Sequence, residues 1–377
     1  MEDNIGLVGD WSQGFAADWD NPPQYNPTDS GIYPPAGINP YTGVVTPVPV
    51  PVPVTPTPPT SDPLTDISIN IIDCLTAYAL RPPGLKLPWR ELQKLTEIDN
   101  GSITTFIAGT SHGKTAVALQ LLLHYLQQGK KVLFFSGEMD KSVLVMRLLS
   151  IIADLSLAKT TDEYRNILSS QPALPAVIKA YRELERLQDL IYITPVNSRD
   201  ADLIKYADAV KPDIIFVDYI QQLRPANKNG RTRDEEIEAV MDTLNSYAIS
   251  TQIPILLFAQ INREARNTDK PSLTCIRHSA TIEQYSANVY GIWNASMARR
   301  QGSIPGVPSD GWYWSDDSKA TEEAIAYADK AEASLLEILI LKSRYHGNVC
   351  KSVPLLFNGL TGSIRDFPTA LSAVKTI

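Results

Sequence analysis

The fold of this chain is decided in one stretch, Phe106-Ile107-Ala108-Gly109-Thr110-Ser111-His112-Gly113-Lys114-Thr115. A β-type run over residues 102–108 leads into a turn of small residues, and apolar residues at helical spacing follow it. In such a turn, successive backbone N–H groups converge on phosphate oxygens, and the next helix presents its positive dipole end to the same anion. The stretch therefore predicts a strand, a loop and a helix that together cradle a nucleoside triphosphate.

The predicted cradle has chemistry assigned to its last two residues. Lys114 is expected to reach the β and γ phosphates of ATP, and the Thr115 hydroxyl is expected to hold Mg²⁺. The usual pattern is G-x-x-x-x-G-K-[ST], whereas here Ala108 takes the first glycine position with loop length unchanged. The alternative is a helix start without chemical meaning, and the flanking strand and helix patterns weigh against it. The expected nucleotide-binding residues are Ala108, Gly109, Thr110, Ser111, His112, Gly113, Lys114 and Thr115.

Charge is unevenly distributed along the chain. The formal net charge is −8 over 377 residues, but residues 1–80 contain no Lys or Arg and nine acidic residues. The remainder therefore carries 34 basic residues against 33 acidic ones, which is 42 minus 9. A near-neutral body excludes a broad basic surface, so any nucleic-acid contact must be a local basic loop.

Three features of the sequence predict a cytoplasmic protein. Cys74, Cys275 and Cys350 are far apart and form no C-x-x-C pair, so we expect buried thiols in a reducing environment. The N-terminus lacks the basic segment and apolar run of a secretory signal. No stretch approaches ~20 consecutive apolar residues, so we expect no membrane span.

The N-terminal part of the chain is rich in proline. Half of the 28 prolines lie between Pro22 and Pro63, and the run 46–60 alternates Pro with Val or Thr. Such a run favours polyproline II, so we predict that residues 1–63 form a disordered tail and a semi-rigid linker. Acidic residues with spaced aromatics in residues 1–45 suit docking on a partner protein, and a merely solubilising extension is the open alternative.

From residue 64 onward, helix and strand patterns alternate. We predict a short helical lead-in over residues 64–98 and one domain over residues 99–377, with an insertion at 298–333. Strands separated by helical stretches predict an α/β fold with a mostly parallel twisted sheet and helices on both faces. The expected strands cover residues 102–108, 131–136, 191–194, 213–218, 254–260, 288–293, 336–341 and 352–357.

Two carboxylates follow predicted strands at chemically useful places. Asp218 ends the apolar run Ile214-Ile215-Phe216-Val217, where it would order the magnesium shell beside the phosphate loop. Glu138 follows the strand next after the loop helix, where it would polarise an attacking water. The competing interpretation of Glu138 is an acid that caps the next helix.

At this point the chain resembles the DnaB-type replicative helicases, a RecA-like hexameric motor family that includes the ring helicases of phages. The resemblance covers roughly residues 85–360. It rests on seven motifs in collinear order, which are Leu87-Pro88-Trp89-Arg90-Glu91-Leu92, Ala108 to Thr115, Ser136-Gly137-Glu138-Met139, Val217-Asp218-Tyr219-Ile220-Gln221, Ala259-Gln260-Ile261-Asn262-Arg263, Arg277-His278-Ser279-Ala280 with Ile282-Glu283-Gln284, and Lys342-Ser343-Arg344-Tyr345-His346-Gly347.

The resemblance implies roles for several of these residues. It implies a RecA-like P-loop NTPase core with ATP and Mg²⁺, in which Glu138 is the catalytic base and Gln260 senses the γ-phosphate. Arg344 and Lys342 would act on the nucleotide of a neighbouring subunit, so the implied protein is a hexameric, DNA-stimulated ATPase in the cytoplasm of a bacterial or phage-infected cell. Its partners would be single-stranded DNA, further copies of itself and a replication protein docked on the tail.

The chain departs from the family at three places. His278 replaces a glutamate, and Tyr285, Ser286 and Ala287 stand where the family has acidic positions. The insertion at 298–333 is longer than the family pattern leads us to expect. The proline-rich leader has no resemblance to the family's helical collar domain.

Two basic loops are candidate DNA contacts, because each follows a strand that carries a nucleotide-sensing residue. Their residues, with one more from the family's R-E-S-G element, are Lys228, Arg231, Arg233, Arg263, Arg266 and Arg277. An ordinary turn surface is the alternative for Lys228 and Arg231. For the whole chain, the alternatives to a helicase are a regulatory or loading ATPase like RecA, KaiC or RadA proteins, and a non-enzymatic scaffold that closes a ring on nucleotide.

Overall fold

The structure is a computed structural model that describes residues 69–226, 230, 232–261, 270–273, 279–300 and 318–368. The chain divides into one unit that ends at Ala77 and another that begins at Tyr78. The predicted tail over residues 1–63 and the predicted DNA-contact residues Lys228, Arg231, Arg263, Arg266 and Arg277 lie outside the described residues. The same holds for residues 301–317 of the predicted insertion.

The helix α2, Ile71–Ala79, begins in the first unit, and its last two residues belong to the second. Asn70 caps it, because its side-chain oxygen accepts from the backbone N–H of Ile72 at 3.0 Å. The helix buries no residue, and its apolar side chains, among them Ile72 and Leu75, are exposed. The expectation of buried thiols is therefore wrong for Cys74, which is exposed on α2, and Cys350 is partly exposed as well.

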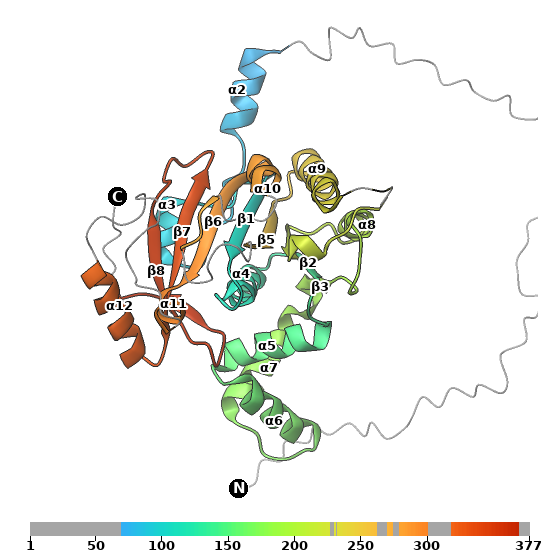
Figure 1. Cartoon of the computed structure of the whole chain (residues 1–377). Coiled ribbons are helices and arrows are strands. Elements are labelled where there is room, and N and C mark those ends of the chain that lie inside the picture. Colours follow the sequence, from blue (N-terminus) through green and yellow to red (C-terminus); the bar gives the residue numbers. More distant parts are fainter. Residues whose placement is uncertain are drawn as a thin grey trace, which may run out of the picture. The chain divides into compact units, whose positions relative to one another are not determined.

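The second unit is built on one sheet of nine strands (Figure 1), in the order β3-β2-β4-β5-β1-β6-β7-β8-β9. Its strands from β3 to β6 in that order are parallel, and β7, β8 and β9 continue it antiparallel. The bounds are β1 Ile103–Ala108, β2 Val132–Ser136, β3 Ile191–Ile193, β4 Ile214–Asp218, β5 Ile255–Gln260, β6 Ser286–Asn294, β7 Ser334–Ser343, β8 Ser352–Phe357 and β9 Ile364–Asp366. The predicted α/β class and mostly parallel sheet are confirmed, and β9 is an addition that the sequence pattern did not predict.

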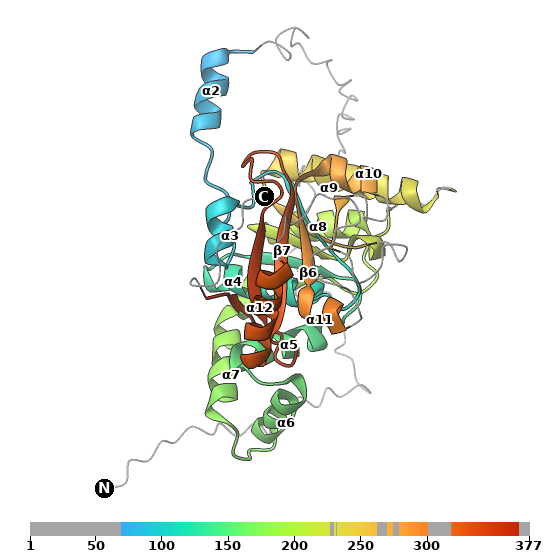
Figure 2. The same ribbon diagram turned by 60° about the vertical axis from the view of Figure 1, so that its left-hand side comes forward.

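Helices cover both faces of this sheet (Figure 2). Alternate residues of β1 point to opposite faces, so Phe106 packs with α4 and α5 while Ile107 packs with α8, α9 and α10. The central strands are buried on both sides, which explains why they read as continuous apolar runs. The helices of this unit are α3 Arg90–Leu95, α4 Lys114–Gln127, α5 Lys141–Ala153, α6 Leu157–Leu168, α7 Pro175–Leu187, α8 Asp200–Val210, α9 Arg233–Thr251, α10 Ser279–Tyr285, α11 Ala295–Arg300 and α12 Ser318–Lys330, with 3₁₀ turns at Gln188–Leu190 and Ile220–Gln222.

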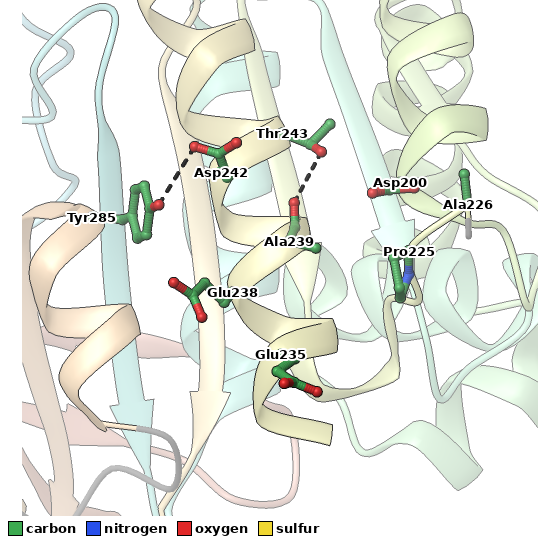
Figure 3. Close-up of a pocket in the computed structure, with 9 residues that line it drawn as sticks. All are labelled: Asp200, Pro225, Ala226, Glu235, Glu238, Ala239, Asp242, Thr243 and Tyr285. Atoms are coloured by element: carbon green, nitrogen blue, oxygen red, sulfur yellow. Dashed lines mark hydrogen bonds between the residues drawn. The ribbon is translucent and has the colours of Figure 1, made fainter. Parts of the chain in front are cut away.

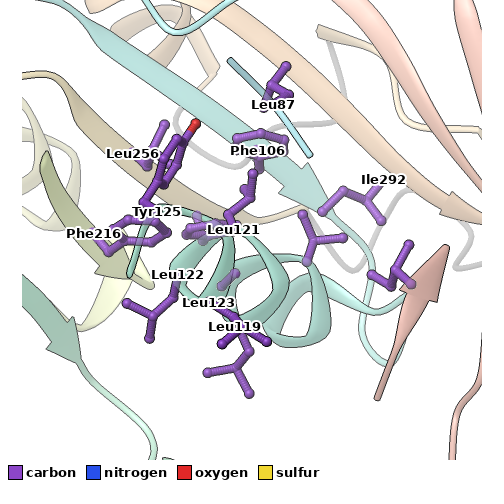
Figure 4. Packing of buried hydrophobic residues seen from close by; sticks show 14 of the residues in the cluster. Leu87, Phe106, Leu119, Leu121, Leu122, Leu123, Tyr125, Phe216, Leu256 and Ile292 are labelled. Carbon is purple, nitrogen blue, oxygen red and sulfur yellow. The ribbon is translucent and has the colours of Figure 1, made fainter. Parts of the chain in front are cut away.

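Aromatic rings form the centre of the core under α4 (Figure 4). Phe106 stacks on Phe258 with ring centroids 5.3 Å apart, and Phe216 continues the stack at 6.3 Å from Phe258. Tyr125 of α4 meets Phe216 edge-on at 6.3 Å. These rings come from β1, β5, β4 and α4, so they lock the phosphate-loop helix onto the central strands. Among the described residues, no helix has both the length and the hydropathy to cross a membrane.

Candidate nucleotide site

The carboxyl ends of four parallel strands meet at one edge of the sheet. Register pairs Ala108 of β1 with Gln260 of β5, and Ser136 of β2 with Asp218 of β4. Parallel strands bring their C-terminal residues to the same edge, which is where open α/β sheets place their ligands. The phosphate loop follows β1 and therefore lies at this edge. It is joined there by Glu138, Asp218 and Gln260, which were predicted from three other motifs.

The loop between β1 and α4 has the backbone geometry of an anion cradle. Gly113 lies at φ +93°, a left-handed conformation that a residue with a Cβ adopts only with strain. The N-cap of α4 is Gly113, which has no side chain to accept from the first N–H groups of the helix. This arrangement suits a phosphate group.

His112 has a structural role that the motif did not reveal. Its ring is buried, and its Nδ1 accepts from the backbone N–H of Asn294 at 3.0 Å. Asn294 is the last residue of β6, so the contact ties the loop to the neighbouring strand. Because any residue is allowed at this position of the motif, only the fold reveals the contact.

Asp218 and Lys114 form the charged centre of the site. Asp218 Oδ1 lies 3.4 Å from Lys114 Nζ, and Lys114 Nζ lies 3.9 Å from the centroid of the Tyr219 ring. Burial raises the pKa of the Asp218 carboxyl above its ordinary value, and the ammonium of Lys114 opposes that shift. The Tyr219 contact is a cation–π interaction that the sequence analysis missed, although the motif Val217–Gln221 had been singled out.

A divalent cation fits this centre. Asp218 Oδ1 is buried and has no hydrogen-bond partner, although it forms the ion pair with Lys114. A hydrogen bond from the Thr115 hydroxyl favours the charged form of Asp218. A carboxylate and a hydroxyl beside a phosphate cradle are the oxygen ligands that Mg²⁺ prefers, so Thr115 and Asp218 remain our predicted metal residues.

Glu138 is exposed beside this centre and does not cap a helix. Its charge raises the pKa of Asp218, which places the two carboxylates near each other. The cap of α5 is Asp140, whose Oδ1 accepts from the backbone N–H groups of Ser142 and Val143. Glu138 is therefore not the cap of α5. Its role as the catalytic base stays a prediction.

Gln260 connects the end of β5 to the phosphate loop. Its Nε2 donates to Thr110 Oγ1 at 2.7 Å. Gln221 holds Gln260 from both sides, because Gln221 Nε2 donates to the Gln260 carbonyl at 3.1 Å and Gln221 Oε1 accepts from the Gln260 N–H at 3.3 Å. The sequence analysis gave Gln221 no role. A side chain that touches the loop and is clamped by a neighbouring motif can report nucleotide state to the segment after β5.

Lys342 and Arg344 lie at the opposite edge of the sheet. Strand β7 is antiparallel to β6, so its C-terminal end lies beside the start of β6, and the Arg344 N–H donates to the Ala287 carbonyl at 2.9 Å. Lys342 Nζ donates to the Glu283 carbonyl at 2.5 Å, and Arg344 Nη2 to the Gln284 carbonyl at 3.3 Å. Burial, followed by the charge of Arg344, lowers the pKa of Lys342. Both cations therefore lie at the carboxyl end of α10, away from their own phosphate loop.

Arg233 is the predicted DNA contact that the structure describes. Its Nη1 pairs with Glu236 Oε2 at 2.5 Å, and its Nη2 donates to the Gln221 carbonyl at 2.6 Å. These contacts give Arg233 a structural role at the start of α9, beside the residue that clamps Gln260. DNA binding by Arg233 stays a prediction, and its guanidinium must leave an ion pair to make that contact.

A separate cavity lies on the α8, α9 and α10 side of the sheet (Figure 3). It has a volume of about 590 Å³, and Figure 3 shows the carboxylates of Glu235, Glu238 and Asp242 along α9, with Tyr285 donating to Asp242 at 3.4 Å. Carboxylates repel phosphate, so this cavity is unsuited to a nucleotide or a DNA backbone. A DNA contact at Arg233, the first residue of α9, would therefore lie on a helix that carries these carboxylates.

Together, the sheet order and the phosphate cradle define a RecA-like P-loop fold. The chain belongs to the DnaB-like helicase C-terminal domain family, whose model matches residues 84–364. This range contains all seven motifs on which the resemblance rests, so the predicted family is confirmed.

The chain is similar to several named replicative helicases. It is 27% identical over 275 residues to a "Probable plasmid replicative DNA helicase" of Chlamydia psittaci, covering 70% of this chain and 51% of the relative. It is 25% identical over 306 residues to "Replicative DNA helicase DnaB" of Helicobacter pylori J99, covering 76% and 58%. The chain thus spans about half the length of the curated relatives it matches.

Two solved structures share the fold. One, described as the structure of a DnaB-like replicative helicase and its interactions with primase, matches with a TM-score of 0.61 at 20% identity, over 81% of this chain and 70% of that one. The other, the ATPase domain of G40P, matches with a TM-score of 0.60 at 18% identity, over 81% and 97%. At identities of 20% and 18%, these two matches show a shared fold and nothing further.

Proposed function

We propose that this chain is an ATP-driven DNA helicase of DnaB type, a ring-forming motor that translocates on single-stranded DNA during DNA replication. Family membership and relatives named replicative DNA helicases support this proposal. The nucleotide is ATP with Mg²⁺, and the assembly is a hexamer of identical chains.

The observation that carries the proposal is the separation of the two halves of the site. The phosphate loop, Asp218 and Gln260 lie at the carboxyl ends of the parallel strands, while Arg344 and Lys342 lie at the other end of the sheet. A cation at that second edge meets a γ-phosphate only when another copy of the chain presents its phosphate loop there. Head-to-tail contacts of this kind form a ring when the rotation between successive copies closes.

The mechanism follows from the chemistry of phosphoryl transfer, which needs positioning and charge neutralisation more than covalent chemistry. Lys114 and the N-terminus of α4 bind the phosphates, and Glu138 orients the attacking water. Thr115 and Asp218 would hold Mg²⁺, which would supply further neutralisation of the phosphate charge when bound. Arg344, helped by Lys342, stabilises the transition state from the neighbouring copy, so hydrolysis depends on assembly.

Coupling to DNA runs through Gln260 in this proposal. Its side chain contacts Thr110 of the phosphate loop, and its backbone is held by Gln221. The chain continues from Gln260 into residues 262–269, which carry the proposed DNA contacts Arg263 and Arg266. A change at the γ-phosphate therefore reaches the proposed DNA loop through one side chain.

Helix α2 offers a second contact for assembly. Ile72 is 73% exposed and Leu75 is 65% exposed on α2, none of whose own residues is buried in the described part of the chain. Apolar side chains gathered in this way are typical of protein contacts. We propose that they pack on a neighbouring copy in the ring. Leu75→Glu is expected to lower the assembled mass, and an unchanged mass would remove α2 from the proposal.

The central experiment measures ATP hydrolysis and unwinding of a forked substrate by the purified chain with Mg²⁺. We expect hydrolysis stimulated by single-stranded DNA, a larger mass with nucleotide, and loss of hydrolysis in Lys114→Ala and Glu138→Gln. Neither DNA-stimulated hydrolysis nor unwinding would refute the proposal. If Lys114→Ala alone prevented assembly and the wild type showed no turnover, the scaffold function would be favoured.

A regulatory or loading ATPase without unwinding activity is the second candidate. The contacts of Tyr285 and Ser286 favour it, because these two residues stand where the family has acidic side chains. Tyr285 donates to Asp242, and Ser286 Oγ lies 2.7 Å from Thr105 Oγ1 in the core. The Ser286 side chain is buried and Tyr285 is bound to α9, so neither replaces an acidic side chain on a DNA loop. DNA-stimulated hydrolysis without unwinding would select this candidate.

A further inference from the structure

The loop between β7 and β8 carries Arg344, and side chains near the start of β1 hold it in place. His346 Nε2 lies 3.1 Å from Asp99 Oδ1. Asn348 Nδ2 donates to the Leu95 carbonyl at 2.6 Å, so a second side chain of the same loop is anchored nearby. The loop therefore contacts residues 95–99 at two points, on either side of Gly347.

Asp99 is itself fixed by the sheet. Its Oδ2 accepts from Asn288 Nδ2 at 2.7 Å, and Asn288 is fully buried in β6 beside β7. Only 17% of the Asp99 side chain and 21% of the His346 side chain is exposed. A partly desolvated hydrogen bond between a carboxylate and an imidazole is stronger and more directional than one in water.

Only Tyr345 separates His346 from Arg344. Arg344 has a backbone contact to Ala287 and a side-chain contact to Gln284 at 3.3 Å, which is close to the outer limit for a hydrogen bond. The exposed arginine is thus anchored by its backbone, and the course of the loop beyond it depends on His346. Moving His346 would change the direction in which Arg344 projects.

We propose that His346, held by Asp99, is a positioning residue for Arg344 and thereby sets the rate of hydrolysis on the neighbouring copy. This inference rests on the proposed function, in which Arg344 acts across a subunit interface. It assigns a role to a residue outside the nucleotide cradle, at the edge of the sheet farthest from its own phosphate loop.

The same side chains have the composition of a metal site, because ligand atoms of Glu97, Asp99 and His346 lie within 4.8 Å of one another. Protein donors already occupy the carboxylates, however. Glu97 accepts from Lys86 Nζ at 2.6 Å and from the Gly84 N–H at 3.2 Å, and Asp99 contacts both His346 and Asn288. Carboxylates satisfied in this way favour a fixed hydrogen-bond network over a cation site.

The test uses full-length chains that differ only at position 346. His346→Ala removes the contact, and His346→Gln keeps an N–H donor at a similar reach. We expect kcat for ATP hydrolysis to fall by about tenfold to a hundredfold in the alanine variant, the usual effect of a misplaced catalytic group. Nucleotide affinity should not change, because the cradle lies at the other edge, and the glutamine variant should keep most of the wild-type kcat.

Mixing experiments separate positioning from general damage to the fold. A His346→Ala chain keeps an intact phosphate loop, and a Lys114→Ala chain keeps an intact Arg344 loop. In a mixed assembly, the phosphate loop of a His346→Ala chain can meet Arg344 of a Lys114→Ala chain. The rate of ATP hydrolysis by the mixture should then exceed the sum of the rates of the two variants measured separately. A chain damaged throughout would not be restored by its neighbour.

Each outcome has a defined meaning. Wild-type kcat in His346→Ala, equal losses in the alanine and glutamine variants, or no recovery on mixing would overturn the positioning role. The same mixture made with Arg344→Ala tests the proposed function separately. If that mixture recovers and the His346→Ala mixture does not, only the present inference fails. Loss of wild-type activity to a zinc-selective chelator at constant Mg²⁺ would assign the cluster to a metal instead.

Discussion

Replacing Arg344 by alanine tests the separation of the two halves of the site. Arg344 bonds to Ala287 at the start of β6, and Asn288, the next residue, pairs with Thr104 of β1. From Thr104 to Ala108, where the phosphate loop begins, the strand rises about 13 Å at ~3.3 Å per residue. Arg344 follows β7, which is two strands away from β1, with β6 between them. Its guanidinium therefore cannot reach the phosphate loop of its own chain.

The expected effect is on turnover and not on nucleotide binding. Loss of a cation that stabilises the transition state from a neighbouring subunit lowers kcat by about 10³-fold or more, which corresponds to ~4 kcal/mol. The affinity for ATP should not change, because Lys114 and the N-terminus of α4 are intact. Arg90→Ala is the matched control, since Arg90 is an exposed arginine paired with Asp366.

Mixed assemblies provide the sharpest assay. If Arg344→Ala and Lys114→Ala chains assemble at random in equal amounts, about a quarter of the head-to-tail interfaces combine an intact phosphate loop with an intact arginine. The mixture should then hydrolyse ATP at about a quarter of the wild-type rate per site, whereas each variant alone is nearly inactive. Wild-type turnover by Arg344→Ala, or a mixture no more active than its components, would refute the reasoning.

Three further predictions concern the carboxyl edge of the sheet. Asp218→Asn should abolish Mg²⁺-dependent hydrolysis and raise the thermal unfolding midpoint at pH 7 by roughly 2–4 °C, because burial raises the pKa of Asp218 and its ionised form opposes folding. Gly137→Ala should lower the free energy of unfolding by about 1–3 kcal/mol in denaturant titrations, because the new Cβ would lie 2.5 Å from Gln222 Cβ, and Gln222→Gly should restore most of it. Gln221→Ala should remove the stimulation of hydrolysis by single-stranded DNA while intrinsic hydrolysis changes little, because Gln260 loses both backbone contacts.

The sign of the Asp218 effect is open to a direct check. A carboxyl with a raised pKa in the folded state contributes stability below its unfolded pKa, and that contribution is lost as pH rises through the folded pKa. The rise in the thermal unfolding midpoint caused by Asp218→Asn should therefore become smaller as the pH is lowered. A rise that became larger at low pH would contradict the prediction. A Gly137→Ala chain as stable as the wild type, or full DNA stimulation in Gln221→Ala, would contradict the other two predictions.

Much of the nucleotide edge could be predicted from the sequence because its signals are local. Ten residues contain the end of a strand pattern, a turn of small residues and Gly-Lys-Thr, in that order. Each of these signals comes from neighbouring residues and predicts its own part of the phosphate cradle. The carboxyl-end rule for parallel strands then brings Asp218 and Gln260 to the same edge once their strands are recognised. The predicted positions of Glu138 and Asp218 needed no contact information.

The contacts that hold these residues could not be predicted in the same way. Gln221 clamps Gln260 across 39 residues of chain, and His112 meets Asn294 across 182. Arg233 was predicted as a DNA contact from its charge in a basic loop, yet its guanidinium is bound to Glu236 and the Gln221 carbonyl. Charge and spacing do not reveal whether a side chain is already engaged by a segment distant in sequence.

By itself, the sequence determined the class of fold, the phosphate cradle and the family, because periodicity and motif chemistry act over a few residues. Only the tertiary structure decided at which edge of the sheet Lys342 and Arg344 lie. Strand β7 runs antiparallel beside β6, and this direction places Arg344 and His346 at the edge opposite the cradle. Strand direction is set by packing across the whole sheet, so the distance between Arg344 and its own phosphate loop can be read only from the folded molecule, whereas the resemblance had already implied a neighbouring copy.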